Sequence, residues 1–152
     1  QELPVAGEHL ASSLLRSVLG AALMESGGDE TAPHVVFATP EGERHELGTL
    51  AAAVVGASYG LRATYLGADL PHGDLALAVK ETRAAALALG IAHQRVDAAR
   101  HYLAAIDRRL EPQVEIWIGG ARCSELANGR VQAIPNFAAL EARAHALRVA
   151  LR

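Results

Sequence analysis

Apolar positions along the chain follow two different spacings, one near the N-terminus and another from residue 34 onward. In the first part, apolar side chains recur every three or four residues, as at Leu10, Leu14 and Val18. This periodicity predicts an amphipathic helix over residues 8–24. A lone amphipathic helix needs a surface to cover. We expect it either to lie on the domain that follows or to pack against helices outside this sequence.

A polar, glycine-containing linker over residues 25–31 separates this helix from short apolar runs that alternate with helical patterns. The runs predict five strands, at residues 35–38, 63–66, 85–91, 114–118 and 131–134. The remaining segments predict five helices, at residues 46–59, 73–83, 95–110, 122–128 and 136–150. We therefore divide the chain into an N-terminal helix with its linker, residues 1–30, and an α/β domain, residues 31–152.

Five strands that alternate with five helices predict a doubly wound parallel sheet with right-handed crossovers. The expected strand order is 2-1-3-4-5, the flavodoxin-like (Rossmann-like) arrangement. Gly60 follows the first helix of the domain, where a left-handed residue is favoured. Ser124 and Asn136 are candidate N-terminal caps for later helices.

Composition is that of an ordinary globular protein and excludes some partners. The 152 residues suffice for one domain with a proper core, and 51% of them are apolar. The formal charge of −3 gives no electrostatic case for direct nucleic-acid binding by this segment. No apolar run approaches the roughly 20 residues of a membrane span, and the first residues show no signal-peptide pattern. We expect a cytoplasmic protein without membrane contact.

Several side chains are expected to be structural. The single Cys123 excludes an intrachain disulfide and fits a buried thiol in a reducing compartment. Trp117 lies on a predicted interior strand, so we expect it in the core. Five histidines show no paired metal-ligand spacing and are expected at the surface or in packing: His34, His72, His93, His101 and His145.

The most informative motif is Glu-Arg-His-Glu-Leu-Gly at residues 43–48, directly after the first predicted strand. Forty-one residues later comes Gly90-Ile91-Ala92, and 26 residues after that comes Gly119-Gly120. The predicted strand order brings all three elements to one crevice at the carboxyl edge of the sheet, where open α/β folds bind ligands. The loop presents an imidazole there, and glycines allow close approach of a ligand to the backbone. The set predicts a cofactor site.

This spacing resembles the cobalamin-binding domain family, whose usual pattern is Asp-x-His-x-x-Gly, Ser-x-Leu and Gly-Gly at these intervals. The resemblance covers residues 34–150. It implies that His45 is the lower axial ligand of cobalt, displacing the dimethylbenzimidazole base, whose tail threads into the sheet crevice. It also implies that Gly48 lets the tail pass close to the helix start, and that Gly119 and Gly120 give the tail room.

Two departures from the family pattern affect the expected site. Glu43 replaces the usual Asp, and its carboxylate is expected to hydrogen-bond the far nitrogen of His45 and so fix its tautomer. The longer side chain leaves open a contact with the cofactor or with the neighbouring helix instead. Gly90 and Ala92 replace Ser and Leu, so we expect the loss of a hydroxyl hydrogen bond to the tail and a wider groove.

The glutamate variant and residues 65–71 resemble the CarH/LitR-type light-sensing transcriptional regulators and the AerR-type antirepressors. Glu8 and His9 resemble the Glu-His element on the last helix of their cap, which lies over the upper face of the corrin. Residues 8–24 would then be one helix of a helical cap. The resemblance implies a cobalamin cofactor, in an adenosyl, methyl or aquo/hydroxo form. The implied cofactor-binding residues are Glu8, His9, Glu43, His45, Gly48, Asp69, Gly90, Ile91, Ala92, Gly119 and Gly120.

This resemblance predicts a light-responsive regulatory domain rather than an enzyme. Loss of the upper cobalt ligand would change what packs under residues 8–24 and so shift a conformation or an oligomeric state. The expected partners are the corrinoid, a transcription factor or fused DNA-binding domain, and a second copy of the chain. The alternative is a cobalamin-carrying module of a methyltransferase or mutase system. A receiver or nucleotide-binding domain fits poorly, because the expected acidic cluster, P-loop and GxGxxG turn are missing.

Overall fold

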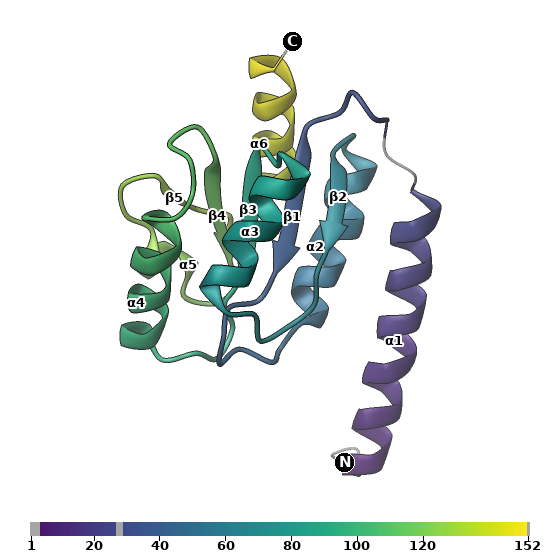
Figure 1. Cartoon of the computed structure of the whole chain (residues 1–152). Coiled ribbons are helices and arrows are strands. Elements are labelled where there is room, and N and C mark those ends of the chain that lie inside the picture. The colour runs from purple at the N-terminus through teal and green to yellow at the C-terminus, as the bar shows by residue number, and fades with distance from the viewer. Residues whose placement is uncertain (1–3, 27–28, 152) are drawn as a thin grey trace.

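Strands and helices alternate along the chain in the order that the hydrophobic pattern predicts (Figure 1). The computed structural model describes residues 4–26 and 29–151, so residues 27–28 of the predicted linker lie outside the described residues. The strands are β1 (His34–Ala38), β2 (Arg62–Tyr65), β3 (Ala86–Gly90), β4 (Glu115–Gly119) and β5 (Val131–Ala133). The helices are α1 (Val5–Glu25), α2 (Leu47–Ser58), α3 (His72–Thr82), α4 (Val96–Asp107), α5 (Cys123–Leu126) and α6 (Phe137–Ala150).

The five strands form one sheet in the order β2-β1-β3-β4-β5, and every neighbouring pair is parallel. This confirms the predicted topology. Strand order reverses between β1 and β3, and a crevice opens at such a point because the helices that follow these strands leave on opposite faces of the sheet. The loops after β1 and β3 therefore meet at the carboxyl edge.

Two apolar clusters cover the two faces of the sheet. Alternate side chains of β1 separate between them, with Val36 and Ala38 on one face and Val35 and Phe37 on the other. The first face packs against α3, α4 and α5, and the second packs against α2 and α6. Because both faces are covered, β1 is buried along its whole length, as is typical of a central parallel strand.

Of the three residues predicted to end or cap a helix, two do so in the structure. Gly60 has a φ of +83°, a left-handed conformation that ends the helical segment of α2. The Asn136 side chain caps α6 by accepting a hydrogen bond from the Ala139 backbone N–H at 2.9 Å. The prediction for Ser124 was wrong, because the N-cap of α5 is Arg122, two residues earlier, and it makes no side-chain cap hydrogen bond.

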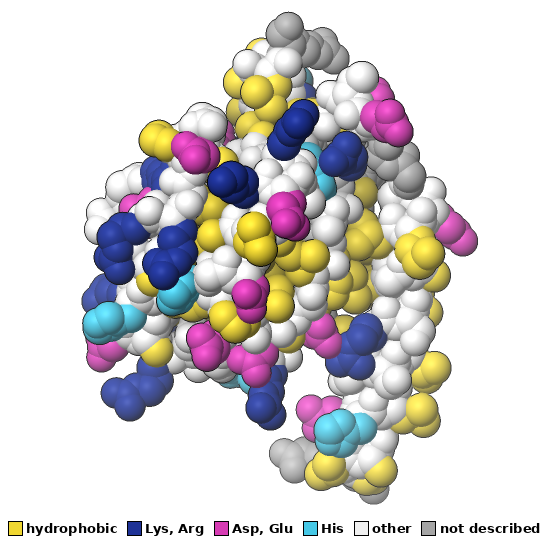
Figure 2. Space-filling view, in the orientation of Figure 1, with side chains coloured by type: hydrophobic (Ala, Val, Ile, Leu, Met, Phe, Trp, Pro, Cys, Tyr) yellow, Lys and Arg dark blue, Asp and Glu magenta, His cyan; other side chains and the backbone are white. Residues whose placement is uncertain are grey.

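Helix α1 lies alongside α2 at the edge of the domain (Figure 1). Its Leu23 packs against the α2 and α6 cluster, but no described residue of α1 is fully buried. The predicted stripe at Leu10, Leu14 and Val18 stays exposed, and hydrophobic side chains gather on the outer flank of α1 (Figure 2). One side of α1 therefore covers the domain, while the apolar stripe faces away from it.

Other structural expectations can be checked directly. Cys123 and Trp117 are buried, as predicted. His34 is a packing residue: its ring nitrogens lie 3.1 Å from the Thr82 carbonyl oxygen and 2.8 Å from the Thr64 hydroxyl. Within the described part of the chain, none of the helices combines the length and the hydropathy that crossing a bilayer requires.

Candidate functional site

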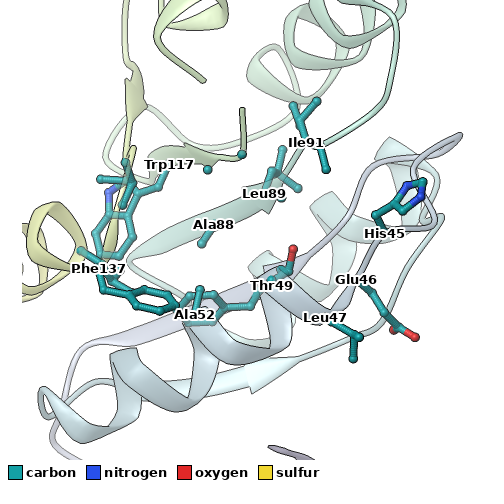
Figure 3. Close-up of a pocket in the computed structure, with 18 of the residues that line it drawn as sticks. His45, Glu46, Leu47, Thr49, Ala52, Ala88, Leu89, Ile91, Trp117 and Phe137 are labelled. Carbon is teal, nitrogen blue, oxygen red and sulfur yellow. The ribbon is translucent and has the colours of Figure 1, made fainter. Parts of the chain in front are cut away.

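A cavity of about 630 Å³ opens at the carboxyl edge of β1, β3 and β4, between α2 and α6 (Figure 3). Its volume falls in the range of sites that hold small organic ligands. The loops after all three strands contribute to its lining, as the predicted topology requires. The structure brings seven of the eleven predicted site residues to the lining: His45, Gly48, Gly90, Ile91, Ala92, Gly119 and Gly120.

His45 stands at the mouth of this cavity (Figure 3), and Glu43 fixes its ring. The imidazole Nδ1 lies 2.7 Å from Glu43 Oε1, and the His45 backbone N–H donates to the same oxygen at 2.9 Å. A carboxylate only accepts hydrogen bonds, so the ring proton sits on Nδ1. In the neutral ring, Nε2 then carries the lone pair that a metal ion needs.

The other carboxylate oxygen of Glu43 reaches across the crevice to the loop after β3. Oε2 accepts hydrogen bonds from the backbone N–H groups of Ala92, His93 and Gln94 at 2.9, 2.6 and 3.0 Å. Glu43 is only 1% exposed, and such burial would raise its pKa. The hydrogen bonds from His93, His45 and Gln94 outweigh this effect and lower the pKa of Glu43 to about 2. The carboxylate is therefore ionised at neutral pH and binds together the two loops that frame the site.

Asp69 supports the loop that carries Glu43, and it is not among the residues that line the cavity. Its carboxylate accepts the Gly42 backbone N–H at 2.7 Å, while its own N–H donates to the Thr39 hydroxyl at 3.0 Å. Thr39 in turn donates to the Glu43 carbonyl oxygen. The left-handed φ of +62° at Asp69 is thus held by contacts on both sides. The observed contacts of Asp69 position the loop.

Helix α1 reaches the cavity through Ser12 and Arg16, while Glu8 and His9 are exposed and outside its lining. Arg16 Nε donates to Glu46 Oε1 at 2.6 Å. The other oxygen of Glu46 accepts a hydrogen bond from the hydroxyl of Tyr65 on β2. Burial raises the pKa of Tyr65 most, and the hydrogen bond to Glu46 and the charge of Glu46 raise it further. This chain of three side chains ties α1 to the rim of the cavity.

The glycines of the motif differ in what a side chain at each position would contact. A Cβ on Gly48 would meet no atom within 4 Å, so packing within the protein does not require glycine there. A Cβ on Gly120, whose φ is +108°, would lie 2.1 Å from the Ile91 carbonyl oxygen, so the backbone itself requires this glycine. On Gly90, a Cβ would lie 1.8 Å from Thr49 Oγ1. The expectation of a wider groove at Gly90 was therefore wrong, because the Thr49 side chain fills that space.

Sequence reasoning missed several residues of the site. The His93 ring packs on His45 with centroids 3.9 Å apart, although His93 was expected to be only a surface or packing residue. Its position directly after Ile91-Ala92 was the available signal. Trp117 is in the core, as predicted, but it also walls the far end of the cavity (Figure 3). Thr49 carried no signal, because its contact with Gly90 depends on how α2 packs on β3.

The small number of ligand side chains limits the kind of metal that the site can hold. The described residues contain no group of three or more His, Cys, Asp and Glu side chains arranged to bind a metal ion. His45 could therefore ligate only a metal that brings its remaining ligands with it, as a metal in a macrocycle does. The open space at Gly48 and the apolar walls behind it fit an organic part of such a ligand.

Fold and site together define a flavodoxin-like domain with one fixed imidazole at the switch point of its sheet. The chain resembles two repressors from Myxococcus xanthus. It is 32% identical to the HTH-type transcriptional repressor CarH over 120 residues, which are 78% of this chain and 40% of that protein. It is 36% identical to the HTH-type transcriptional repressor CarA over 93 residues, 61% of this chain and 32% of that protein. The chain thus matches only part of the length of these relatives.

Solved structures show the same fold at low sequence identity. A cobalamin-binding protein from Desulfitobacterium hafniense DCB-2 has a TM-score of 0.65 and 21% identity, covering 76% of this chain and 59% of that one. The monomethylamine corrinoid protein of Methanosarcina barkeri has a TM-score of 0.65 and 16% identity, covering 91% of this chain and 66% of that one. No protein-family model matches the sequence.

Proposed function

We propose that this chain is a cobalamin-binding regulatory domain in which His45 is the lower axial ligand of cobalt. The observation that carries the proposal is the hydrogen bond between His45 Nδ1 and the buried, ionised Glu43 at the cavity mouth. That bond orients the ring and leaves Nε2 as the ligand atom. The names of the two structural neighbours, a cobalamin-binding protein and a corrinoid protein, support a corrinoid as the ligand.

The remaining cavity residues would hold the organic part of the cofactor. Gly48 leaves open space beside the start of α2, where the nucleotide tail would pass. Trp117 and Leu140 would wall the slot that receives the end of the tail. Ser12 and Arg16 would face the corrin from α1, with Glu8 and His9 one turn earlier on the same helix. Asp69 would contribute through the loop that it supports.

Regulation would follow because α1 both lines the cavity and is held at its rim. When bound, an alkylated corrinoid supplies a cobalt–carbon bond that visible light breaks, while the protein supplies placement and readout. Because Arg16 belongs both to the lining and to the ion pair with Glu46, a change in what fills the cavity alters how α1 is held. The exposed stripe of α1 is then the surface that presents this change to a partner. The resemblance to two transcriptional repressors supports a transcription factor, a DNA-binding domain or a second copy as that partner.

Cobalamin binding is tested by titrating the protein in the dark with hydroxocobalamin, methylcobalamin and adenosylcobalamin while the absorption spectrum is recorded. We expect His45→Ala to weaken binding at least about tenfold and to remove the spectral signature of a histidine ligand. His145→Ala is the matched control, because His145 is exposed on α6, outside the cavity lining. Equal spectra and affinities for His45→Ala and wild type would overturn the assignment of His45.

The regulatory part of the proposal has its own test. Protein loaded with each alkylcobalamin is exposed to green light, and its spectrum and mass in solution are compared before and after exposure. We expect the corrin bands to change together with the mass or the elution volume. A bound corrinoid that leaves both unchanged in light would contradict a light-responsive function while leaving cobalamin binding intact.

A cobalamin-carrying module of a methyltransferase system is the second candidate. The likeness to the monomethylamine corrinoid protein over 91% of this chain favours it. Such a module would present its corrinoid to a partner enzyme, so methyl transfer to the loaded protein would depend on that enzyme and a methyl donor. A mass in solution that does not change in light, together with methyl transfer to the loaded protein, would favour the carrier over the regulator.

A further inference from the structure

Thr49 occupies an unusual position in the cavity. It lies in the first turn of α2, between His45 at the mouth and Trp117 at the far end (Figure 3). Its side chain fills the volume that a Cβ on Gly90 would need, with Oγ1 only 1.8 Å from that position. Thr49 is 6% exposed, and it belongs to the cavity lining. The missing side chain at position 90 thus places the Thr49 hydroxyl against β3, at the entrance to the inner part of the cavity.

The inner part of the cavity beyond Thr49 is an apolar slot. Its walls are formed by aromatic and aliphatic side chains, namely Phe37, Ala52, Ala88, Trp117, Phe137 and Leu140. Two polar atoms nearby are already used: Trp117 Nε1 donates to Glu115 at 2.7 Å, and Asn136 Oδ1 accepts a hydrogen bond from the Ala139 N–H at 2.9 Å. None of the hydrogen bonds among the described residues involves the Thr49 hydroxyl. That hydroxyl is a donor still available to a ligand in the slot.

The apolar slot and the Thr49 hydroxyl together determine which kind of chemical group the slot can bind. A flat aromatic group suits a slot walled by Trp117, Phe37 and Phe137. A polar atom on that group would lose water on entering and would need a hydrogen-bond partner. A hydroxyl donates to a ring nitrogen. The slot therefore fits a heteroaromatic base that carries one unprotonated nitrogen.

We propose that the Thr49 hydroxyl donates a hydrogen bond to the heteroaromatic base at the end of the corrinoid tail. This inference rests on the proposed function, because the base loses its metal contact only if His45 takes that position. The donor comes from α2, and Gly90 is required because any side chain there would displace it. Thr49 is thus a specificity-determining residue for ligands that carry such a base.

The test compares Thr49→Val with Thr49→Ser, using cobalamin and cobinamide as ligands in dark titrations. Valine keeps the branched shape beside Gly90 and removes the hydroxyl, whereas serine keeps the hydroxyl. Cobinamide lacks the nucleotide tail and so cannot use the slot. We expect Thr49→Val to weaken cobalamin binding roughly three- to tenfold, Thr49→Ser to stay near wild type, and cobinamide affinity to be unchanged by either.

Each contrary outcome has a distinct meaning. Wild-type cobalamin affinity in Thr49→Val would overturn the role of Thr49 and leave the proposed function standing. Equal weakening of cobalamin and cobinamide would assign Thr49 a packing role only, which also overturns the inference. A wild-type protein that binds no cobalamin would overturn the proposed function and this inference together.

A second variant keeps the inference testable if Thr49→Val fails to fold. Gly90→Ser combined with Thr49→Ala moves the hydroxyl to the opposite side of the same contact and removes the 1.8 Å clash with Oγ1, which leaves a tight contact of 3.1 Å to the Cβ of residue 49. We expect this double variant to bind cobalamin more tightly than Thr49→Ala alone. Equal affinities for the double variant and Thr49→Ala would overturn the inference.

Discussion

A buried carboxylate with five hydrogen-bond donors holds the histidine of the cavity in place. Glu43 collects two donors from His45 and three backbone N–H groups from residues 92–94. A buried charge is costly unless it is paired and hydrogen-bonded, and here every donor is supplied by the two loops that frame the site. The same residue therefore orients the ring and holds the β1 and β3 loops together.

The lowered pKa of Glu43 predicts how stability depends on pH. Because its folded pKa is about 2, against 4.5 for an ordinary glutamate, ionised Glu43 favours the folded state. The contribution is fully present above about pH 4.5 and is lost as the pH falls toward 2. We expect Glu43→Gln to lower the free energy of unfolding at pH 7 by roughly 3 kcal/mol, measured by urea denaturation.

The difference between wild type and Glu43→Gln should also shrink as the pH is lowered below about 4.5. Glu141→Gln is a suitable control, because Glu141 is exposed on α6. We expect this control to change stability by less than about 0.5 kcal/mol at any pH. A Glu43→Gln variant as stable as wild type at pH 7 would show that the network contributes little.

At the scale of the helices, two glycines offer a matched comparison. Gly48 in α2 and Gly20 in α1 both lie within helices, and a Cβ on either would meet no atom within 4 Å. Alanine is the better helix former by about 0.5–1 kcal/mol, since glycine loses more backbone entropy on folding. Only Gly48 lines the cavity. The protein therefore keeps a weaker helix former at Gly48 in a place where packing does not demand it.

We expect Gly20→Ala to raise the free energy of unfolding of the ligand-free protein by about 0.5–1 kcal/mol, and Gly48→Ala, in the first turn of α2, to raise it by up to that amount. Gly48→Ala alone should weaken cobalamin binding, by about tenfold, because its methyl group would occupy space that the ligand uses. Urea denaturation and dark titration measure the two effects separately. If Gly48→Ala bound cobalamin as wild type does, the open space beside α2 would not be part of the ligand site.

The elements also show which parts of the fold the sequence could reveal. Strand and helix positions were predictable because alternating apolar runs and helical periodicity reflect local burial. The packing side of α1 was not, since the stripe at Leu10, Leu14 and Val18 left open whether it covers the domain or packs against helices outside this sequence, and the structure leaves it exposed. Periodicity identifies an apolar stripe, but which side of a helix packs depends on partners elsewhere. The helix predicted over residues 122–128 is shorter in the structure, Cys123–Leu126, because a four-residue helix carries almost no periodic signal that fixes its ends.

For the whole molecule, topology was the part of the site that sequence could predict. The order of the strands required the loop with His45 and the turns at Gly90 and Gly119 to meet, and they line one cavity. The atomic contacts between them could not be predicted. Glu43 reaches backbone groups some 50 residues away, and Thr49 fills the space at Gly90. Such contacts depend on the distance between packed layers, which no local pattern encodes.

The cavity joins segments from the whole molecule, so its ligand should stabilise the whole molecule. Its lining includes Ser12 of α1, Ala52 of α2, Trp117 of β4 and Leu140 of α6. A ligand that binds only the folded state adds about 2.7 kcal/mol of stability at 100 times its dissociation constant. For a chain of this length, that gain corresponds to a rise in Tm of roughly 5–10 °C.

We therefore expect hydroxocobalamin to raise the Tm of wild-type protein by about this amount at 100 times the measured dissociation constant, followed by circular dichroism in the dark. His45→Ala at the same ligand concentration should show a smaller rise, because its binding is weaker, whereas His145→Ala should match wild type. A ligand that shifted the spectrum but left the Tm of wild type unchanged would bind the unfolded chain as well as the folded one, and so would not need the folded cavity. The thermal rise thus tests whether the imidazole at the sheet edge and the apolar slot behind it act as one site.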